Sequence, residues 1–374
     1  MSEENRRVRV GLIGVGAIAD YVHVPAIQWA VDAELVAIAD PDHTLLQRRQ
    51  QQWRIPRSYT DPTELLADET VDAVIIATPN DLHAPLAIAA ARHRKHVLCE
   101  KPLALSLDEA VTMLQEAAAA GICHMTAFTY RFVPAMRFLK ALVESGELGT
   151  IRHFRSQRFQ DWPETSLGWR QYRRTAGSGE LADMASHRID FGHYLIGPIA
   201  EVCGALKQFV PRDRDAHGHP VAPSDTDDWV AFIGLFANGA TGVWESTKLA
   251  RGRGSGGKGH DFVELNGSKA SAIYELRHPY RVLVGSTGGS YREVPVPEEF
   301  LKHPESRRNP REGDPERVWR WDQDAEFIAA IRSRRPAVPS FADGAQCQAV
   351  MEAVQQAWQE KRWVQVREVT ATAG

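Results

Sequence analysis

The stretch that decides the fold is Val8-Arg9-Val10-Gly11-Leu12-Ile13-Gly14-Val15-Gly16-Ala17-Ile18-Ala19. Its apolar first half predicts a strand, and residues 17–30 predict a helix that Pro25 shapes or kinks. Between the two lies a match to the pattern G-x-G-x-x-G/A, in which glycine lets the backbone turn tightly and approach a pyrophosphate group. Glycines are common in turns, so the flanking segments must decide. The predicted phosphate contacts are Gly14, Gly16, Ala17 and Ile18.

An acidic residue follows at the expected distance. The apolar run 34–39 predicts a second strand, and it ends at Asp40, about 20 residues beyond the glycines. A strand, a glycine turn, a helix and this carboxylate together predict a dinucleotide-binding Rossmann domain. Asp40 would accept hydrogen bonds from the adenosine ribose and would repel a 2'-phosphate, so NAD is expected and NADP is less favoured. The alternative is a turn residue that ends a strand before Pro41.

The order of the remaining elements predicts an α/β fold with two domains. Helices are expected at 43–52, 84–94 and 106–120 and strands at 71–77 and 96–99, an alternation typical of a parallel sheet. Beyond residue 125, strands separated by turns predict an open, mainly antiparallel sheet, at 151–159, 200–210, 228–236, 240–248, 261–266, 271–276 and 280–284. Two late helices at 322–334 and 343–361 precede a strand at 363–366. We therefore expect a Rossmann domain at 1–125 and a substrate-binding and oligomerisation domain at 126–374.

Composition narrows the class of protein. The 374 residues include 44 Lys and Arg and 48 Asp and Glu, a formal charge of -4 that favours neither nucleic acid nor an anionic membrane as a partner. The polar start and the lack of a long apolar span predict a cytoplasmic protein. Four widely spaced cysteines are interpreted as reduced thiols.

A second glycine-rich segment, Gly252-Arg253-Gly254-Ser255-Gly256-Gly257-Lys258-Gly259, matches most of a nucleotide-phosphate P-loop. Gly259 stands where Ser or Thr would hold magnesium, and a strand follows instead of a helix. We interpret the segment as a mobile hairpin loop, and no metal is expected in the protein.

Two further motifs carry candidate chemistry. Lys101, in Glu100-Lys101-Pro102, follows the strand 96–99 and would stand at the carboxyl edge of a parallel sheet, where ligands bind; the alternative is a surface lysine. In the segment 177–190, a predicted helix places Asp183, His187 and Asp190 on one face. A histidine between carboxylates can carry a proton near neutral pH, and the alternative is a solvated ion-pair face.

With these motifs in view, the sequence resembles the Gfo/Idh/MocA family over nearly the whole chain. The resemblance rests on Gly14-x-Gly16-x-x-Ala19, Ala77-Thr78-Pro79-Asn80 with His83, Glu100-Lys101-Pro102, Tyr130-Arg131-Phe132 with Pro134, Trp169-Arg170, and Gly179-x-Leu181-x-Asp183-x-x-x-His187-x-x-Asp190. It implies that Lys101, Asp183 and His187 surround the reacting carbinol. It also implies that Trp169 and Arg170 contact the nicotinamide end and that Thr78, Pro79, Asn80, His83 and Glu100 line the cofactor cleft.

The resemblance predicts an NAD-dependent oxidoreductase that acts on a hydroxyl of a sugar, anhydrosugar or cyclic polyol, or on the matching keto-sugar. Tyr130, Arg131 and Trp162 are pocket candidates by position, or else pack between domains. A homodimer or homotetramer is implied. The alternatives are an NAD-dependent glycosidase that works through transient oxidation and a non-catalytic sugar-pathway sensor. One departure from the family pattern is Gly177-Ser178-Gly179-Glu180 in place of three glycines and a small residue, and it would reshape the mouth of the pocket.

Overall fold

A computed structural model of the chain describes residues 7–215, 217–255, 259–315 and 317–369. The chain forms two compact units. Among the described residues, the first unit runs to Thr129 and also contains Lys302–Ala345 and Val369. The second unit comprises Tyr130–Leu301 and Gln346–Glu368.

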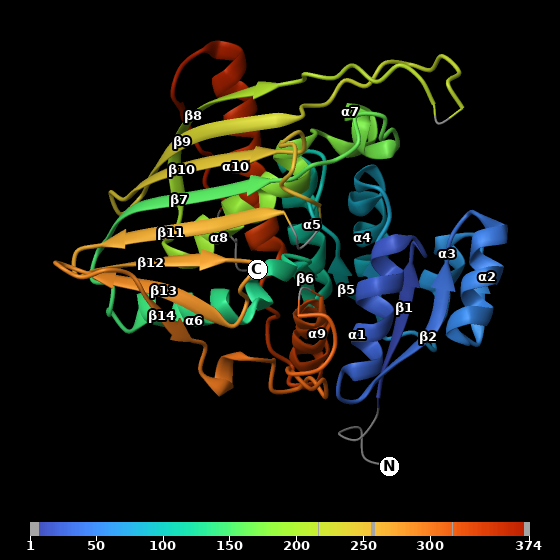
Figure 1. Ribbon diagram of the computed structural model, residues 1–374. Coiled ribbons are helices and arrows are strands. Elements are labelled where there is room, and N and C mark those ends of the chain that lie inside the picture. Colours follow the sequence, from blue (N-terminus) through green and yellow to red (C-terminus); the bar gives the residue numbers. More distant parts are fainter. Residues whose placement is uncertain (1–6, 216, 256–258, 316, 370–374) are drawn as a thin grey trace. The chain divides into compact units, whose positions relative to one another are not determined.

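The first unit is built on a six-stranded parallel sheet with the order β3-β2-β1-β4-β5-β6 (Figure 1). Its core strands are nearly continuous apolar runs, as expected for a sheet covered on both faces. The strand order reverses between β1 and β4, which is where an open α/β sheet binds its ligand. The strands are β1 Val8–Ile13, β2 Ala33–Ala39, β3 Arg57–Tyr59, β4 Ala73–Ile76, β5 His96–Cys99 and β6 His124–Thr126.

The helices of this unit follow local signals in the sequence. Ser106 caps α5 by accepting from the Glu109 amide, and Gly121 ends it with φ at +64°. The predicted helix 17–30 is a π-helical segment, η2 Ala19–His23, followed by α1 Val24–Trp29, whose first turn tolerates Pro25. The other helical segments are α2 His43–Trp53, α3 Pro62–Ala67, η3 Asn80–Leu82, α4 His83–Arg92, α5 Leu107–Ala120, η9 Val318–Trp321 and α9 Asp322–Arg332.

The second unit is built on a nine-stranded sheet with the order β14-β13-β12-β11-β7-β10-β9-β8-β15 (Figure 1). Every pair is antiparallel except β7 with β10. Buried Trp244 of β10 stacks on Phe232 and donates to the Arg188 carbonyl of α8, which ties the helix to the sheet. The strands are β7 Ile151–Phe159, β8 Ile199–Lys207, β9 Trp229–Phe236, β10 Thr241–Thr247, β11 His260–Gly267, β12 Ala270–Glu275, β13 Arg281–Ser286, β14 Arg292–Pro295 and β15 Val364–Gln365.

Helices α6 and α8 pack against this sheet. The helical segments that lie wholly or partly in the second unit are η4 Thr129–Phe132, α6 Pro134–Glu144, η5 Trp169–Gln171, α7 Arg173–Ala176, η6 Leu181–Ala185, α8 Ser186–Leu195, η8 Glu298–Phe300 and α10 Phe341–Glu360. The predicted α/β class, a Rossmann domain followed by a mainly antiparallel sheet, is confirmed.

Three details differ from the sequence predictions. The compact units divide after Thr129 instead of after residue 125, and residues 302–345 return to the first unit because α9 packs on α1, β1 and β5. The segment 252–259 is not a hairpin loop, because β10 and β11 lie on opposite sides of β7; its residues 256–258 lie outside the described residues. Asp183 and His187 do not share one continuous α-helix, because Leu181–Ala185 is π-helical.

Within the described residues, no helix is long and apolar enough to cross a membrane. The same residues contain no cluster of His, Cys, Asp and Glu side chains suited to a metal ion.

Candidate active site

The glycine turn after β1 has the backbone that a dinucleotide needs. Gly14 has φ at +92°, and a Cβ there would lie 2.6 Å from the Ala77 carbonyl oxygen, so no larger residue fits. A Cβ at Gly16, in contrast, would meet nothing within 4 Å. The side of Gly16 on which a Cβ would stand is therefore open, and a pyrophosphate can approach the backbone closely from that side. The turn fits NAD.

Asp40 joins this turn to the end of β2. Its Oδ2 accepts from the Val15 amide at 3.0 Å, and its Oδ1 accepts from the Asp42 amide at 2.9 Å. The side chain therefore stabilises the turn, which agrees with the alternative interpretation of Asp40 as a turn residue at the end of the strand. A carboxylate has about four acceptor sites and these bonds use two, so the half-buried group can still accept from ribose hydroxyls.

The predicted cleft residues after β4 are held together by His83. The ring is fully buried, with Nδ1 2.8 Å from the Pro102 carbonyl oxygen and Nε2 3.1 Å from that of Thr78. His83 thus contacts both carbonyl oxygens, and burial lowers its pKa although these two oxygens act to raise it. It therefore links the segment after β4 to the segment after β5. Pro79 is half-buried and Asn80 is buried in the same segment.

Glu100, next to half-buried Lys101, belongs to a buried charged triad. Its Oε2 accepts from the Lys101 amide at 3.1 Å, and its Oε1 lies 3.3 Å from Nε2 of His23. The other nitrogen of His23 lies 2.9 Å from Oδ1 of Asp324. Burial alone would lower the pKa of His23, but the charges and hydrogen bonds of Asp324 and Glu100 raise it to about 10. His23 is therefore an imidazolium between two carboxylates.

In the second unit, two cations contact Asp183. Lys248 Nζ lies 3.1 Å from its Oδ2, and Arg170 Nε lies 4.0 Å from its Oδ1. Lys248 Nζ also lies 3.5 Å from Oε2 of Glu180. Two of the predicted aromatic residues accompany these cations, since Lys248 lies 5.5 Å from the Trp162 ring centroid and Arg170 4.2 Å from that of Trp169.

His187 lies on the first turn of α8 and is 3% exposed. The Tyr130 ring meets it edge-on, with 4.6 Å between ring centroids. Asp190, one turn further, is held by Arg131, whose Nε donates to Oδ2 at 2.9 Å. The two carboxylates of the motif thus each have their own cationic partners.

The site residues gather in two sets, one in each unit. The first unit brings together the Gly14 turn, Asp40, the residues after β4, Glu100 and Lys101. The second unit brings together Tyr130, Arg131, Trp162, Trp169, Arg170, Asp183 and His187.

Sequence reasoning missed His23, Asp324 and Lys248. The position of His23, a single histidine shortly after the glycine turn, was a signal that could have found it. Nothing in the sequence pattern marked Asp324 or Lys248, because their partners lie far away along the chain.

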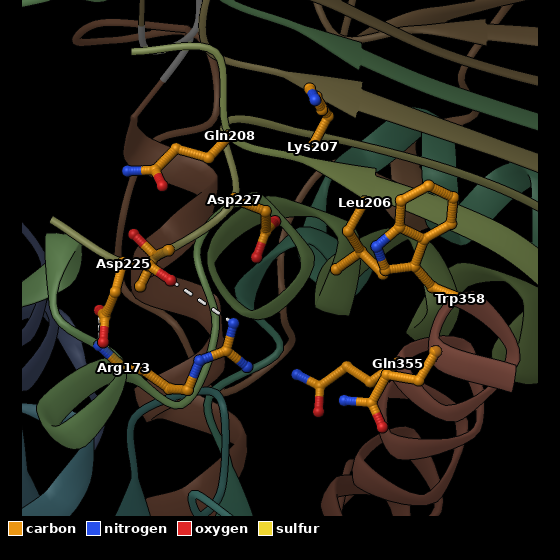
Figure 2. Close-up of a pocket in the computed structure, with 10 residues that line it drawn as sticks. Arg173, Leu206, Lys207, Gln208, Asp225, Asp227, Gln355 and Trp358 are labelled. Carbon is orange, nitrogen blue, oxygen red and sulfur yellow. Dashed lines mark hydrogen bonds between the residues drawn. The ribbon is translucent and has the colours of Figure 1, made fainter. Parts of the chain in front are cut away.

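A separate cavity of about 240 Å³ lies in the second unit (Figure 2). No predicted site residue is among the described residues that line it, so the chemistry above does not use it. In Figure 2 the Arg173 guanidinium points to Asp225, whose carbonyl oxygen lies 3.4 Å from Nη2. The lining residues are Arg173, Leu206, Lys207, Gln208, Asp225, Thr226, Asp227, Gln355, Trp358 and Gln359.

Comparison with known proteins covers both units. The oxidoreductase family with an NAD-binding Rossmann fold, GFO_IDH_MocA, matches residues 8–128, and the GFO/IDH/MocA C-terminal domain matches residues 136–273. Levoglucosan dehydrogenase of Pseudarthrobacter phenanthrenivorans is 32% identical over 98% of this chain and 100% of its own. Myo-inositol 2-dehydrogenase of Thermotoga maritima is 29% identical over 97% and 99%.

Solved structures agree with this relationship. A levoglucosan dehydrogenase in complex with NADH and levoglucosan is 32% identical, covers 97% of this chain and 100% of its own, and superposes with a TM-score of 0.87. Its complex with NADH and L-sorbose gives a TM-score of 0.89 at 31% identity, over 97% of this chain and 100% of its own. With the Gly14 turn and both domain matches in place, the chain belongs to the Gfo/Idh/MocA family of oxidoreductases and is an NAD-dependent dehydrogenase.

Proposed function

We propose that the protein oxidises a secondary hydroxyl of a sugar, anhydrosugar or cyclic polyol, or reduces the matching keto-sugar. The observation that supports the proposal is that Asp183, which contacts two cations, and His187 lie on consecutive helical segments of the same unit. The names of the relatives support the substrate class, because levoglucosan and the inositols are both cyclic molecules with several secondary hydroxyls.

Each residue in the proposal has a defined task. NAD, when bound, supplies the hydride acceptor. Nε2 or Nδ1 of His187 takes the hydroxyl proton, and the Lys101 ammonium stabilises the negative charge that develops on the substrate oxygen. Asp183 favours the imidazolium form of His187 through its negative charge.

The remaining predicted residues bind the two small molecules. Gly14, Gly16, Ala17 and Ile18 hold the pyrophosphate and Asp40 the ribose. Thr78, Pro79, Asn80, His83, Glu100, Trp169 and Arg170 shape the cofactor cleft. Tyr130, Arg131 and Trp162 shape the sugar pocket.

The test is NADH formation, followed by absorbance, across a panel of inositols, aldoses and anhydrosugars. At least one member should reduce NAD in stoichiometric amount, and a panel without turnover refutes the substrate class. A glycosidase working through transient oxidation would release an aglycone without accumulating NADH, so aryl glycosides in the panel separate the two activities. A sensor would bind sugar without either reaction.

We also expect a homodimer or homotetramer. Ile233 and Leu235 of β9 are 46% and 39% exposed and form apolar surface that a second copy could cover. Light scattering coupled to gel filtration measures the mass. The cytoplasmic location and the lack of a nucleic-acid or membrane partner remain predictions.

A further inference from the structure

Lys248 is a buried cation that the proposed chemistry does not use. It directly follows β10, it is 5% exposed, and its ammonium lies between the carboxylates of Asp183 and Glu180, at 3.1 and 3.5 Å. Burial penalises its charge, but the two carboxylates outweigh that penalty and raise its pKa. The two carboxylates therefore favour the ammonium form of Lys248.

Glu180 is the anchor of this arrangement. It is fully buried, and its Oε1 accepts from the Ser246 hydroxyl at 2.5 Å. The Glu180 amide donates to the Asp227 carbonyl at 3.0 Å. At the preceding residue, Gly179, a Cβ would lie 1.9 Å from that same oxygen, so the backbone is pressed against Asp227. Glu180 thus has a fixed place from which it holds Lys248.

Asp227 fixes the same turn through its side chain. Its Oδ1 accepts from the Gly179 amide at 2.8 Å, and its Oδ2 accepts from the Leu181 amide at 2.9 Å. The π-helical turn that carries Asp183 therefore starts from a rigid base. Asp183 itself is 14% exposed, so its carboxylate lies between this buried base and the surface of the unit.

We propose that Lys248 is a positioning residue, held by Glu180, that fixes the carboxylate of Asp183 for the reaction. The inference rests on the proposed function, in which Asp183 acts beside His187. Arg170 contacts the other carboxylate oxygen from 4.0 Å but is 44% exposed, so Lys248 provides the firmer hold.

The arrangement also predicts a pH response. Burial raises the pKa of Glu180 to about 7. The charge of Asp183 acts in the same direction, and the charge of Lys248 acts against it. Ser246 and Asp227 are the other polar neighbours of Glu180. Below that pH, Glu180 is neutral and Asp183 alone balances the ammonium. Above it, the two carboxylates share Lys248, so the restraint on Asp183 weakens.

The first experiment measures kcat, KM and NAD affinity for Lys248→Met, Lys248→Arg and a control, Lys207→Met, which alters an exposed lysine at the end of β8. Lys248→Met should lose about 10²-fold in kcat, the scale of an ångström of misplacement, while NAD affinity and the control remain near wild type. Lys248→Arg should recover part of the loss because it keeps the charge. A folded Lys248→Met enzyme with wild-type kcat overturns the proposal.

Should Lys248→Met fail to fold, the double variant Glu180→Gln/Lys248→Met removes both buried charges and keeps an acceptor for Ser246. The double variant should fold, and its kcat should be as low as the kcat expected for Lys248→Met, because Glu180 acts through Lys248. A folded double variant with wild-type kcat refutes the positioning role.

The second experiment needs no turnover. Infrared difference spectra between pH 6 and 8 should show the signal of a carboxylic acid, and Glu180→Gln should abolish this signal. Asp183→Asn should move the ionisation of this group to lower pH, and Lys248→Arg should leave it near the wild-type pH. If Asp183→Asn does not change the pH of this ionisation, the inference is wrong even when the enzyme is active. If no sugar is oxidised but the ionisation moves as expected, the proposed function fails and the charge network stands.

Discussion

Replacing His23 by Gln should destabilise the first unit in a pH-dependent manner. His23 is 1% exposed, and glutamine keeps hydrogen-bonding groups but cannot carry the charge that faces Glu100 and Asp324. Removing one member of a buried charge group typically costs about 3–5 kcal/mol.

The sign of the pH effect follows from the two pKa values of His23. The folded pKa of about 10 lies above the ordinary 6.5, so the stabilisation is complete below pH 6.5 and is lost as the pH rises through 10. At about 1.4 kcal/mol per pKa unit, the whole difference corresponds to about 5 kcal/mol. The cost of His23→Gln should therefore fall by about 3 kcal/mol between pH 6 and pH 9.

Urea unfolding of the full chain at both pH values measures this cost, with wild type and variant always compared at the same pH. His93→Gln is the matched control, because His93 is exposed after the end of α4 and its replacement should change stability by less than about 0.5 kcal/mol. An equal cost of His23→Gln at pH 6 and pH 9 would show that the buried ring is neutral and that the charged triad is misassigned.

Three further predictions concern the site itself. Asp40→Asn keeps an oxygen for the Val15 amide and removes the charge, so the ratio of NADP to NAD affinity should rise; an unchanged ratio in paired titrations contradicts the ribose role. Lys101→Ala should keep wild-type melting temperature and NAD binding while turnover falls steeply, and activity within a few-fold of wild type would remove Lys101 from the chemistry. His187→Ala should lose about 10²–10⁴ in rate and flatten the rise of activity with pH; an unchanged acid limb would mean that another group takes the proton.

Local patterns were sufficient for most of the fold. Strands such as β5 and β7 could be predicted because apolar residues recur within short segments. Helix α5 could be predicted because Ser106 precedes it and Gly121 follows it. Short elements such as β3 and β14 were missed, because three or four residues carry too little periodicity to rise above turns. The π-helical turn at Leu181–Ala185 was missed for a related reason, since no residue preference distinguishes it from an α-helix.

The sequence by itself determined the Rossmann turn, the acidic residue after β2 and the motifs that bear Lys101, Asp183 and His187, because each depends on spacing within a short segment. Only the tertiary structure decided which charges meet. His23 and Asp324 are 301 residues apart and Asp183 and Lys248 are 65 apart, and each pair is joined by packing of separate elements. The electrostatic energy of a buried ion depends on distance and on exclusion of water, and neither quantity is defined until the chain has folded.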